Sequence, residues 1–214
     1  MLKDSFFDRD ASQTAMDLLG KVIRKRYGDK ILSARITETE SYYIHEKGSH
    51  ASLGYTEKRR ALFMPAGTIY MYYARGKDSL NVSCHGEGNA VLIKGAAPFT
   101  DELSPPETID IMHELNPAAN GAKRPVKRLC AGQTLLCRSL GIKLTEWNGR
   151  NFIEGEFWFD DTGYRPEKIV KTTRLGIPKG RDEHLHYRFV DFAFTDACTS
   201  NPLTKNSGYS IIEL

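Results

Sequence analysis

The sequence predicts an α+β fold in which a mostly antiparallel, curved sheet has helices grouped around it. Two observations lead to this prediction. Segments rich in β-branched and aromatic residues follow one another along most of the 214-residue chain, and helical patterns are confined to three places. This order of elements is typical of an α+β domain. The length fits one domain, residues 1–214, and no linker divides it.

The first predicted element is a helix that begins at residue 11. Asp10 can cap its N-terminus, and Gly20 ends it. Its apolar residues share one face: Ala11, Ala15, Leu18 and Leu19.

Strands dominate the rest of the chain. Val22 and Ile23 lead through a turn at Gly28 and Asp29 into a long strand over residues 30–43. Further strands are expected over residues 68–73, 79–84, 90–94, 156–160, 169–173 and 188–192, helices over 107–115 and 128–140, and loops over 44–60 and 116–127.

The composition excludes several classes of protein. Hydrophobic residues make up 40% and charged residues 27% of the chain, which does not fit a disordered chain, a coiled coil or a collagen-like repeat. No run of apolar residues is long enough for a membrane span, and the N-terminus does not resemble a secretory signal. The four cysteines form no C-x-x-C pair, so we expect buried thiols, with Cys130 and Cys137 on one helix face, in a reducing intracellular environment.

Charge is distributed unevenly along the chain, although the net charge is only +3. Residues 101–119 hold five acidic and no basic side chains. Residues 123–150 hold seven basic and one acidic side chain, and residues 168–181 hold five basic and no acidic ones. The two basic segments indicate a face that fits a polyanion such as nucleic acid, and the alternative is an ordinary solvated surface.

The strand over residues 30–43 carries the most informative pattern. Because strand side chains alternate, one face holds Leu32, Ala34, Ile36, Glu38, Glu40 and Tyr42. The apolar, core-directed face therefore continues into two carboxylates, which are costly to bury unless they are paired or functional. We expect a functional site there, a structural glutamate paired with a buried Arg or Lys, or a strand that twists outward so that the carboxylates reach water.

Aromatic residues are concentrated just after this strand. Six of the ten tyrosines lie between residues 42 and 73, and Tyr70 and Tyr72 share a strand face. Such rings can stack on a nucleobase or belong to an aromatic core. The segment from His45 to His50 is one residue too long for a zinc-binding H-E-x-x-H motif, so we predict no metal and no cofactor. His50 follows Glu40 by ten residues and can bond a ligand.

Several segments together resemble one known family. They are residues 36–42 (I-T-E-T-E-S-Y), 49–52 (S-H-A-S), 63–72 (F-M-P-A-G-T-I-Y-M-Y), 80–83 (L-N-V-S), 129–132 (L-C-A-G) and 136–142 (L-C-R-S-L-G-I). In order and spacing they resemble the alkyladenine (3-methyladenine) DNA glycosylase family of the mammalian type, which is also found in bacteria. The resemblance extends from about residue 7 to residue 192.

The resemblance implies a monofunctional DNA repair enzyme that flips damaged purines out of double-stranded DNA and hydrolyses their N-glycosidic bond. Glu40 matches the family's general base, which activates a water. Tyr42, His50 and Tyr72 match the residues that enclose the base, and Asn81 matches the residue that excludes normal guanine. The resemblance implies no metal, and we expect a monomer, located in the cytoplasm or nucleoid of a bacterium or in a eukaryotic nucleus.

The sequence departs from the family pattern at three places. Lys94 stands where the family has an arginine near the catalytic water, which keeps the charge but loses the forked geometry. The hairpin before Asn81 is one residue short, so the residue that wedges into the DNA stack is either Tyr73 or Arg75. Residues 132–137 read G-Q-T-L-L-C instead of G-P-x-K-L-C.

Other contacts and other functions follow from the same residues. Lys77 in the hairpin turn and Arg174 in the second basic segment are predicted to contact DNA. Two alternative functions remain: a non-catalytic protein that binds damaged or flipped bases, and a hydrolase of free nucleosides. The basic segments favour a DNA substrate over a free nucleoside.

Overall fold

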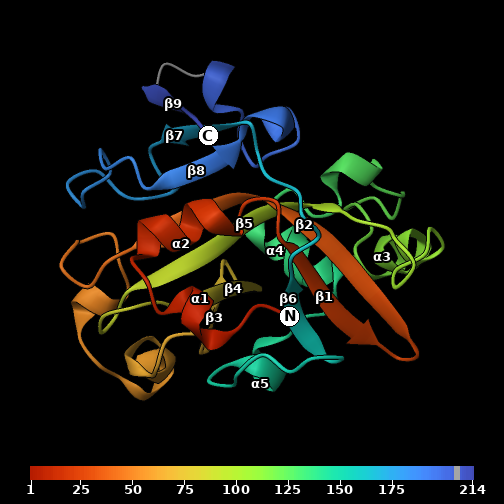
Figure 1. Ribbon diagram of the computed structural model, residues 1–214, viewed down its shortest axis with the longest axis horizontal. Coiled ribbons are helices and arrows are strands. Elements are labelled where there is room, and N and C mark those ends of the chain that lie inside the picture. The colour runs from red at the N-terminus through yellow and green to blue at the C-terminus, as the bar shows by residue number, and fades with distance from the viewer. Residues whose placement is uncertain (205–207) are drawn as a thin grey trace.

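The computed structural model describes residues 1–204 and 208–214, and one antiparallel sheet runs through these residues (Figure 1). The strand order is β3-β4-β5-β2-β8-β7-β9, with β1 paired to β2 and β6 paired to β1, which confirms the predicted fold class. The described strands are β1 (Val22–Tyr27), β2 (Lys30–Tyr42), β3 (Ile69–Ala74), β4 (Lys77–Ser83), β5 (Ala90–Pro98), β6 (Phe157–Asp160), β7 (Lys168–Thr172), β8 (Arg188–Asp191) and β9 (Tyr209–Glu213).

Helices pack around the sheet, and the main hydrophobic core lies between the helices and the sheet. The described α-helices are α1 (Asp4–Phe7), α2 (Ala11–Leu18), α3 (Thr108–Leu115), α4 (Gln133–Ser139) and α5 (Leu144–Trp147). Short 3₁₀ segments lie at Ala51–Leu53, Glu57–Phe63, Val126–Arg128, Phe192–Phe194 and Pro202–Thr204. None of the helices in the described ranges is long and apolar enough to cross a membrane.

Helix α2 packs against β2 and β5 (Figure 1). Its N-cap is Asp10, whose carboxylate accepts hydrogen bonds from the amides of Ser12 and Gln13, as the sequence predicted. On the sheet side, the Thr39 hydroxyl donates to the Ala15 carbonyl at 2.8 Å. The helix therefore fixes the position of the second half of β2.

Strand β2 exchanges its two faces in the middle, which simple alternation does not predict. Its pairing with β5 slips at Thr37, an extra residue of β2, and again at Lys94, an extra residue of β5. After this double irregularity Thr39 pairs with Ile93 on the core side. The prediction that the core-directed face continues into Glu38 and Glu40 is therefore wrong, because both carboxylates lie on the opposite face.

Several predicted boundaries also differ from the structure. The helix expected over residues 128–140 begins only at Gln133, because it is preceded by a 3₁₀ turn at Val126–Arg128 and by Gly132, whose positive φ of 145° is not helical. All four cysteines are buried free thiols, and Cys130 lies before α4 rather than on it, so the shared helix face was wrong. Helices α1 and α5 and strand β9 were not predicted, because four or five residues carry too little periodicity.

Candidate active site

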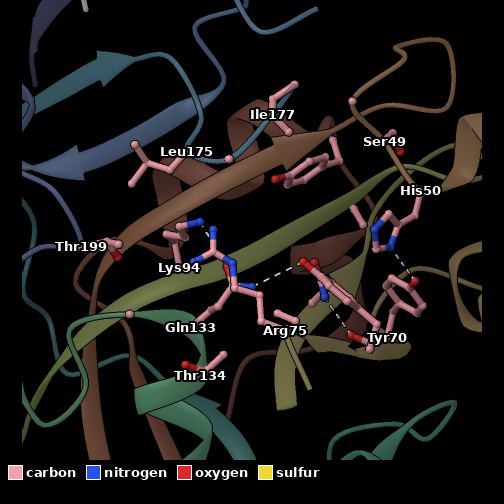
Figure 2. Close-up of a pocket in the computed structure, with 18 of the residues that line it drawn as sticks. Ser49, His50, Tyr70, Arg75, Lys94, Gln133, Thr134, Leu175, Ile177 and Thr199 are labelled. Carbon is pink, nitrogen blue, oxygen red and sulfur yellow. Dashed lines mark hydrogen bonds between the residues drawn. The ribbon is translucent and has the colours of Figure 1, made fainter. Parts of the chain in front are cut away.

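A cavity of about 630 Å³ opens between the β3–β4–β5 edge of the sheet, the start of α4 and two loops. This size is typical of a site that binds a small molecule or a single nucleotide. Its wall combines aromatic rings with a few polar groups (Figure 2). The lining residues on which the chemistry depends are Tyr42, His50, Tyr70, Tyr72, Asn81, Lys94, Gln133 and Leu175.

Glu40 lies directly behind this wall and is 0% exposed. One carboxylate oxygen accepts the Tyr42 hydroxyl at 2.7 Å, and the other accepts the Leu175 amide at 3.1 Å. The Lys94 ammonium lies 3.4 Å from the second oxygen. Tyr42, Lys94 and Leu175 all line the cavity, so the carboxylate is one side chain away from whatever the cavity holds.

Glu38 has a different environment from Glu40, although both lie on the same face of β2. Its carboxylate accepts a 2.6 Å hydrogen bond from Arg188, which is 2% exposed, and a 2.8 Å bond from the Thr199 amide. Gly95 is paired with Glu38, and a Cβ there would lie 3.0 Å from its carboxylate. Glu38 is the structural glutamate paired with a buried arginine, and only Glu40 borders the cavity.

A chain of polar groups joins Lys94 to the aromatic wall. The Lys94 ammonium donates to the side-chain carbonyl of Gln133 at 3.1 Å, and the Gln133 amide donates to the Tyr72 hydroxyl at 3.4 Å. Figure 2 shows Lys94 and Gln133 on one side of the cavity and His50 and Tyr70 on the other. The substitution at position 133 and the lysine at position 94 thus act as one hydrogen-bonded unit.

The aromatic wall is formed by residues of β3 and the loop after β2. His50 packs edge-on against Tyr72, with ring centroids 4.5 Å apart, and its Nδ1 lies 2.9 Å from the Tyr70 hydroxyl. Partial burial, together with Arg59 and Arg181, lowers the pKa of His50 below its usual value. The ring is therefore neutral near pH 7, and Nε2 is the nitrogen that can reach a bound base.

Tyr42 is held as a neutral phenol. Burial, the Glu40 carboxylate and the nearby Tyr72 raise the pKa of Tyr42 well above 10. The hydroxyl therefore remains a donor to Glu40 and leaves the ring face available for stacking.

Asn81 projects from β4 into the cavity wall. The neighbouring residues Leu80, Val82 and Cys84 point into the hydrophobic core, so Asn81 faces the other way, as alternation predicts. Its amide donates to the Tyr70 carbonyl at 3.1 Å. This bond holds the side chain rigid in the wall.

The β3–β4 hairpin turns tightly beside the cavity mouth. Arg75 and Gly76 have φ values of 53° and 75°, which makes a two-residue turn of type I′. Arg75 lines the cavity, whereas Tyr73 faces away and is 55% exposed. Lys77 is exposed at the end of the turn.

Arg174 lies inside the protein, where it cannot reach a DNA phosphate. Its guanidinium forms a two-pronged ion pair with Glu46, and both side chains are buried. It also donates to the Ser41 carbonyl at 3.1 Å and lies 4.5 Å from the centre of the Tyr42 ring. The predicted contact of Arg174 with DNA does not fit this position, and the residue instead supports the back of the wall.

Part of the two basic segments is neutralised locally. Lys123 pairs with Asp110, and Lys168 pairs with Glu213. Arg181 and Arg75 are the cations of the cavity mouth among the described lining residues. Within residues 1–204 and 208–214, no cluster of three or more His, Cys, Asp or Glu side chains is able to hold a metal ion.

Sequence reasoning missed three groups that the fold brings to this site. The Leu175 amide carries no sequence signal, because a backbone group is present at every residue. Gln133 was visible only as a departure from the family pattern. Thr199 lines the cavity and orients Glu38 from a segment distant in sequence, which no local pattern indicates.

Comparison with known proteins gives consistent matches over almost the whole chain. The family model described as methylpurine-DNA glycosylase matches residues 5–193. A Pseudomonas fluorescens protein, named provisionally as a 3-methyladenine DNA glycosylase, is 61% identical over 95% of this chain and 88% of its own length. A Pseudomonas aeruginosa protein with the same name is 58% identical over 95% and 85%. A Koribacter versatilis protein with that name is 29% identical over 87% and 88%.

Proposed function

The chain belongs to the methylpurine-DNA glycosylase family, and from this premise we propose that it excises alkylated and deaminated purines from double-stranded DNA. It is a DNA glycosylase, a hydrolase of DNA repair. The proposed lesions are 3-methyladenine, 7-methylguanine, hypoxanthine and ethenoadenine. Because the substrate is chromosomal DNA and the similar proteins named above are bacterial, we expect the enzyme in the nucleoid.

The proposed reaction requires the damaged nucleotide to leave the stack, because the target bond is inaccessible within a duplex. The flipped base enters the cavity and lies against Tyr42 and Tyr72, and His50 Nε2 bonds its edge. Purine nucleotides alkylated at N3 or N7 are cationic and favour the electron-rich faces of tyrosine rings. Stacking of this kind contributes about 1–3 kcal/mol per base.

The observation that carries the proposal is the buried Glu40 carboxylate, oriented by Tyr42 and Leu175 immediately behind the cavity. We propose that Glu40 takes a proton from a water as that water attacks C1′. The C1′–N bond to the base breaks, and the new C1′–O bond leaves an abasic sugar. The transition state resembles an oxocarbenium ion, which the negative carboxylate stabilises.

We assign selectivity against normal guanine to Asn81. Its amide borders the cavity and is held by the Tyr70 carbonyl, which supports a contact with the minor-groove edge of a flipped purine. Guanine carries an exocyclic amino group at this edge, and adenine and hypoxanthine do not. A rigid side chain rejects that group through a clash and an unpaired buried donor.

The β3–β4 hairpin is proposed as the wedge that fills the space left by the flipped nucleotide. Arg75 is the preferred wedge residue, because it lines the cavity mouth while Tyr73 faces away. The exposed Lys77 beside it is proposed to contact a phosphate.

One assay tests the reaction and its base together. A duplex with a single hypoxanthine is incubated with the unchanged protein and with Glu40→Gln, and alkali then reveals abasic sites as strand breaks. We expect breaks from the unchanged protein and a loss of about 10²–10⁴ in rate for the variant. Binding to a duplex with an abasic-site analogue serves as the control and should survive the substitution.

Three outcomes would contradict the proposal. Excision by Glu40→Gln near the rate of the unchanged protein would remove Glu40 from the role of base. Hydrolysis of free inosine without base release from the duplex would indicate a nucleoside hydrolase. Tight binding of the lesion duplex without any base release would indicate a non-catalytic protein.

A further inference from the structure

Lys94 is the one lysine among the described residues that line the cavity. Its side chain is nearly buried, with 8% of the residue exposed, and its ammonium lies 3.4 Å from the Glu40 carboxylate and 3.1 Å from Gln133. The irregular pairing between β2 and β5 leaves Lys94 as the unpaired residue of β5. The fold therefore places a primary amine beside the carboxylate that faces the sugar in the proposed function.

This position has a chemical consequence that an arginine there would not have. A lysine amine adds to carbonyl carbons and forms imines, whereas a guanidinium stays protonated and does not. Hydrolysis of the glycosidic bond produces such a carbonyl, because the abasic sugar opens to an aldehyde at C1′. The other cations of the cavity mouth, Arg75 and Arg181, are guanidinium groups.

We propose that Lys94 captures the abasic product as an imine at C1′, and that the enzyme then cuts the DNA strand by β-elimination. This inference rests on the proposed function, because the glycosylase reaction is expected to leave C1′ next to Glu40. It extends the activity beyond that of a monofunctional glycosylase, which leaves the strand intact.

Imine formation at C1′ needs only Lys94, Glu40 and water. Once Glu40 has released the proton of the attacking water to solvent, its carboxylate takes a proton from the Lys94 ammonium, 3.4 Å away. The neutral amine attacks C1′ of the aldehyde and gives a carbinolamine. Glu40 returns its proton to the carbinolamine hydroxyl, water leaves, and the protonated imine forms.

The same carboxylate completes the elimination. Glu40, again negative, takes a proton from C2′, and the electron pair forms a C2′–C3′ double bond as the C3′–O bond breaks. The 3′ phosphate leaves with its oxygen as the 5′-phosphate end of a new strand. Water then hydrolyses the imine and frees Lys94.

Reductive trapping tests the imine directly. A duplex with a preformed abasic site is incubated with the full-length protein and sodium borohydride, which reduces an imine to a stable amine. The variant Lys94→Arg keeps the positive charge and cannot form an imine. Lys3→Arg, at an exposed position near the N-terminus and away from the cavity, is the matched control. Denaturing gels then measure the covalent complex, and mass spectrometry of the trapped unchanged protein identifies the modified residue.

We expect the complex to form with the unchanged protein and with Lys3→Arg, to fall at least tenfold with Lys94→Arg, and to carry the adduct on Lys94. Strand breaks without alkali should follow the same order. Equal trapping by Lys94→Arg, or an adduct on another amine, would overturn the proposal. The peptide map needs no variant, so it decides the question even if Lys94→Arg does not fold. Base release from a hypoxanthine duplex separately measures the glycosylase step.

Discussion

Replacement of Arg174 by methionine distinguishes two possible roles of this residue. The basic segment predicts a contact with a DNA phosphate, whereas the structure shows a buried ion pair behind the cavity wall. The side chain is buried and forms a two-pronged ion pair with Glu46, which is also buried. Removal of one partner of such a pair leaves a buried charge without compensation, which costs about 3–5 kcal/mol. For a protein of this size each kcal/mol lowers the melting temperature by about 2–4 °C, so we expect a decrease of roughly 6–20 °C.

Activity should fall as well, because Arg174 supports the ring of Tyr42. The guanidinium lies 4.5 Å from the ring centre, and such cation–π contacts contribute about 0.5–2 kcal/mol. If the ring stacks on the flipped base, we expect single-turnover excision of hypoxanthine to slow by about 2- to 30-fold at a temperature where the variant is folded. Loss of this support should not change binding to undamaged duplex.

The salt dependence of binding to undamaged duplex distinguishes this role from a phosphate contact. Loss of one phosphate contact lowers the slope of log affinity against log salt by about 0.9. We expect no such change for Arg174→Met. The exposed Lys179 of the same segment provides the matched control, and Lys179→Met should melt as the unchanged protein does.

A second substitution tests the ion pair itself. Arg174→Met combined with Glu46→Gln removes both charges and should recover part of the lost stability, because the uncompensated carboxylate is gone. Normal melting of Arg174→Met together with a reduced salt slope would refute the reasoning and restore the contact with DNA.

Four further predictions follow from the site. Glu38→Gln should lower the melting temperature by at least about 6 °C, because Arg188 loses its partner, and excision by the folded variant should persist; an unchanged melting curve would contradict this. Asn81→Ser should raise the release of normal guanine from plasmid DNA about ten- to a hundredfold, whereas a parallel loss of all activities would indicate that Asn81 only supports the hairpin. Arg75→Ala should reduce 2-aminopurine fluorescence beside a lesion, and an unchanged signal would assign the wedge to Tyr73. His50 should titrate by NMR with a midpoint below 6.5, and Arg181→Gln should raise that midpoint because a positive neighbour is lost; a midpoint at or above 6.5 in the unchanged protein would refute the assignment.

Local patterns in the sequence were sufficient for much of the fold. The Asp10 cap of α2 depends on a few adjacent residues, and the structure contains it. The alternation around Asn81 depends only on strand geometry, so its direction into the cavity was predictable. The family followed from several short motifs in a fixed order, and the comparisons confirm it. The roles of the individual site residues stay predictions.

Tertiary structure decided which carboxylate borders the cavity and which cation is buried. Glu38 and Glu40 are equivalent in an alternating strand, and their partners from distant segments separate them: Arg188 pairs with Glu38, and the Leu175 amide beside the cavity bonds Glu40. Arg174 belongs to a basic segment, yet Glu46, 128 residues away in sequence, draws it into the interior. Strand periodicity is set by bonds between neighbours, so it is readable along the chain. Ion pairs and bulges depend on residues that meet only after folding, and their energies therefore have no local signature.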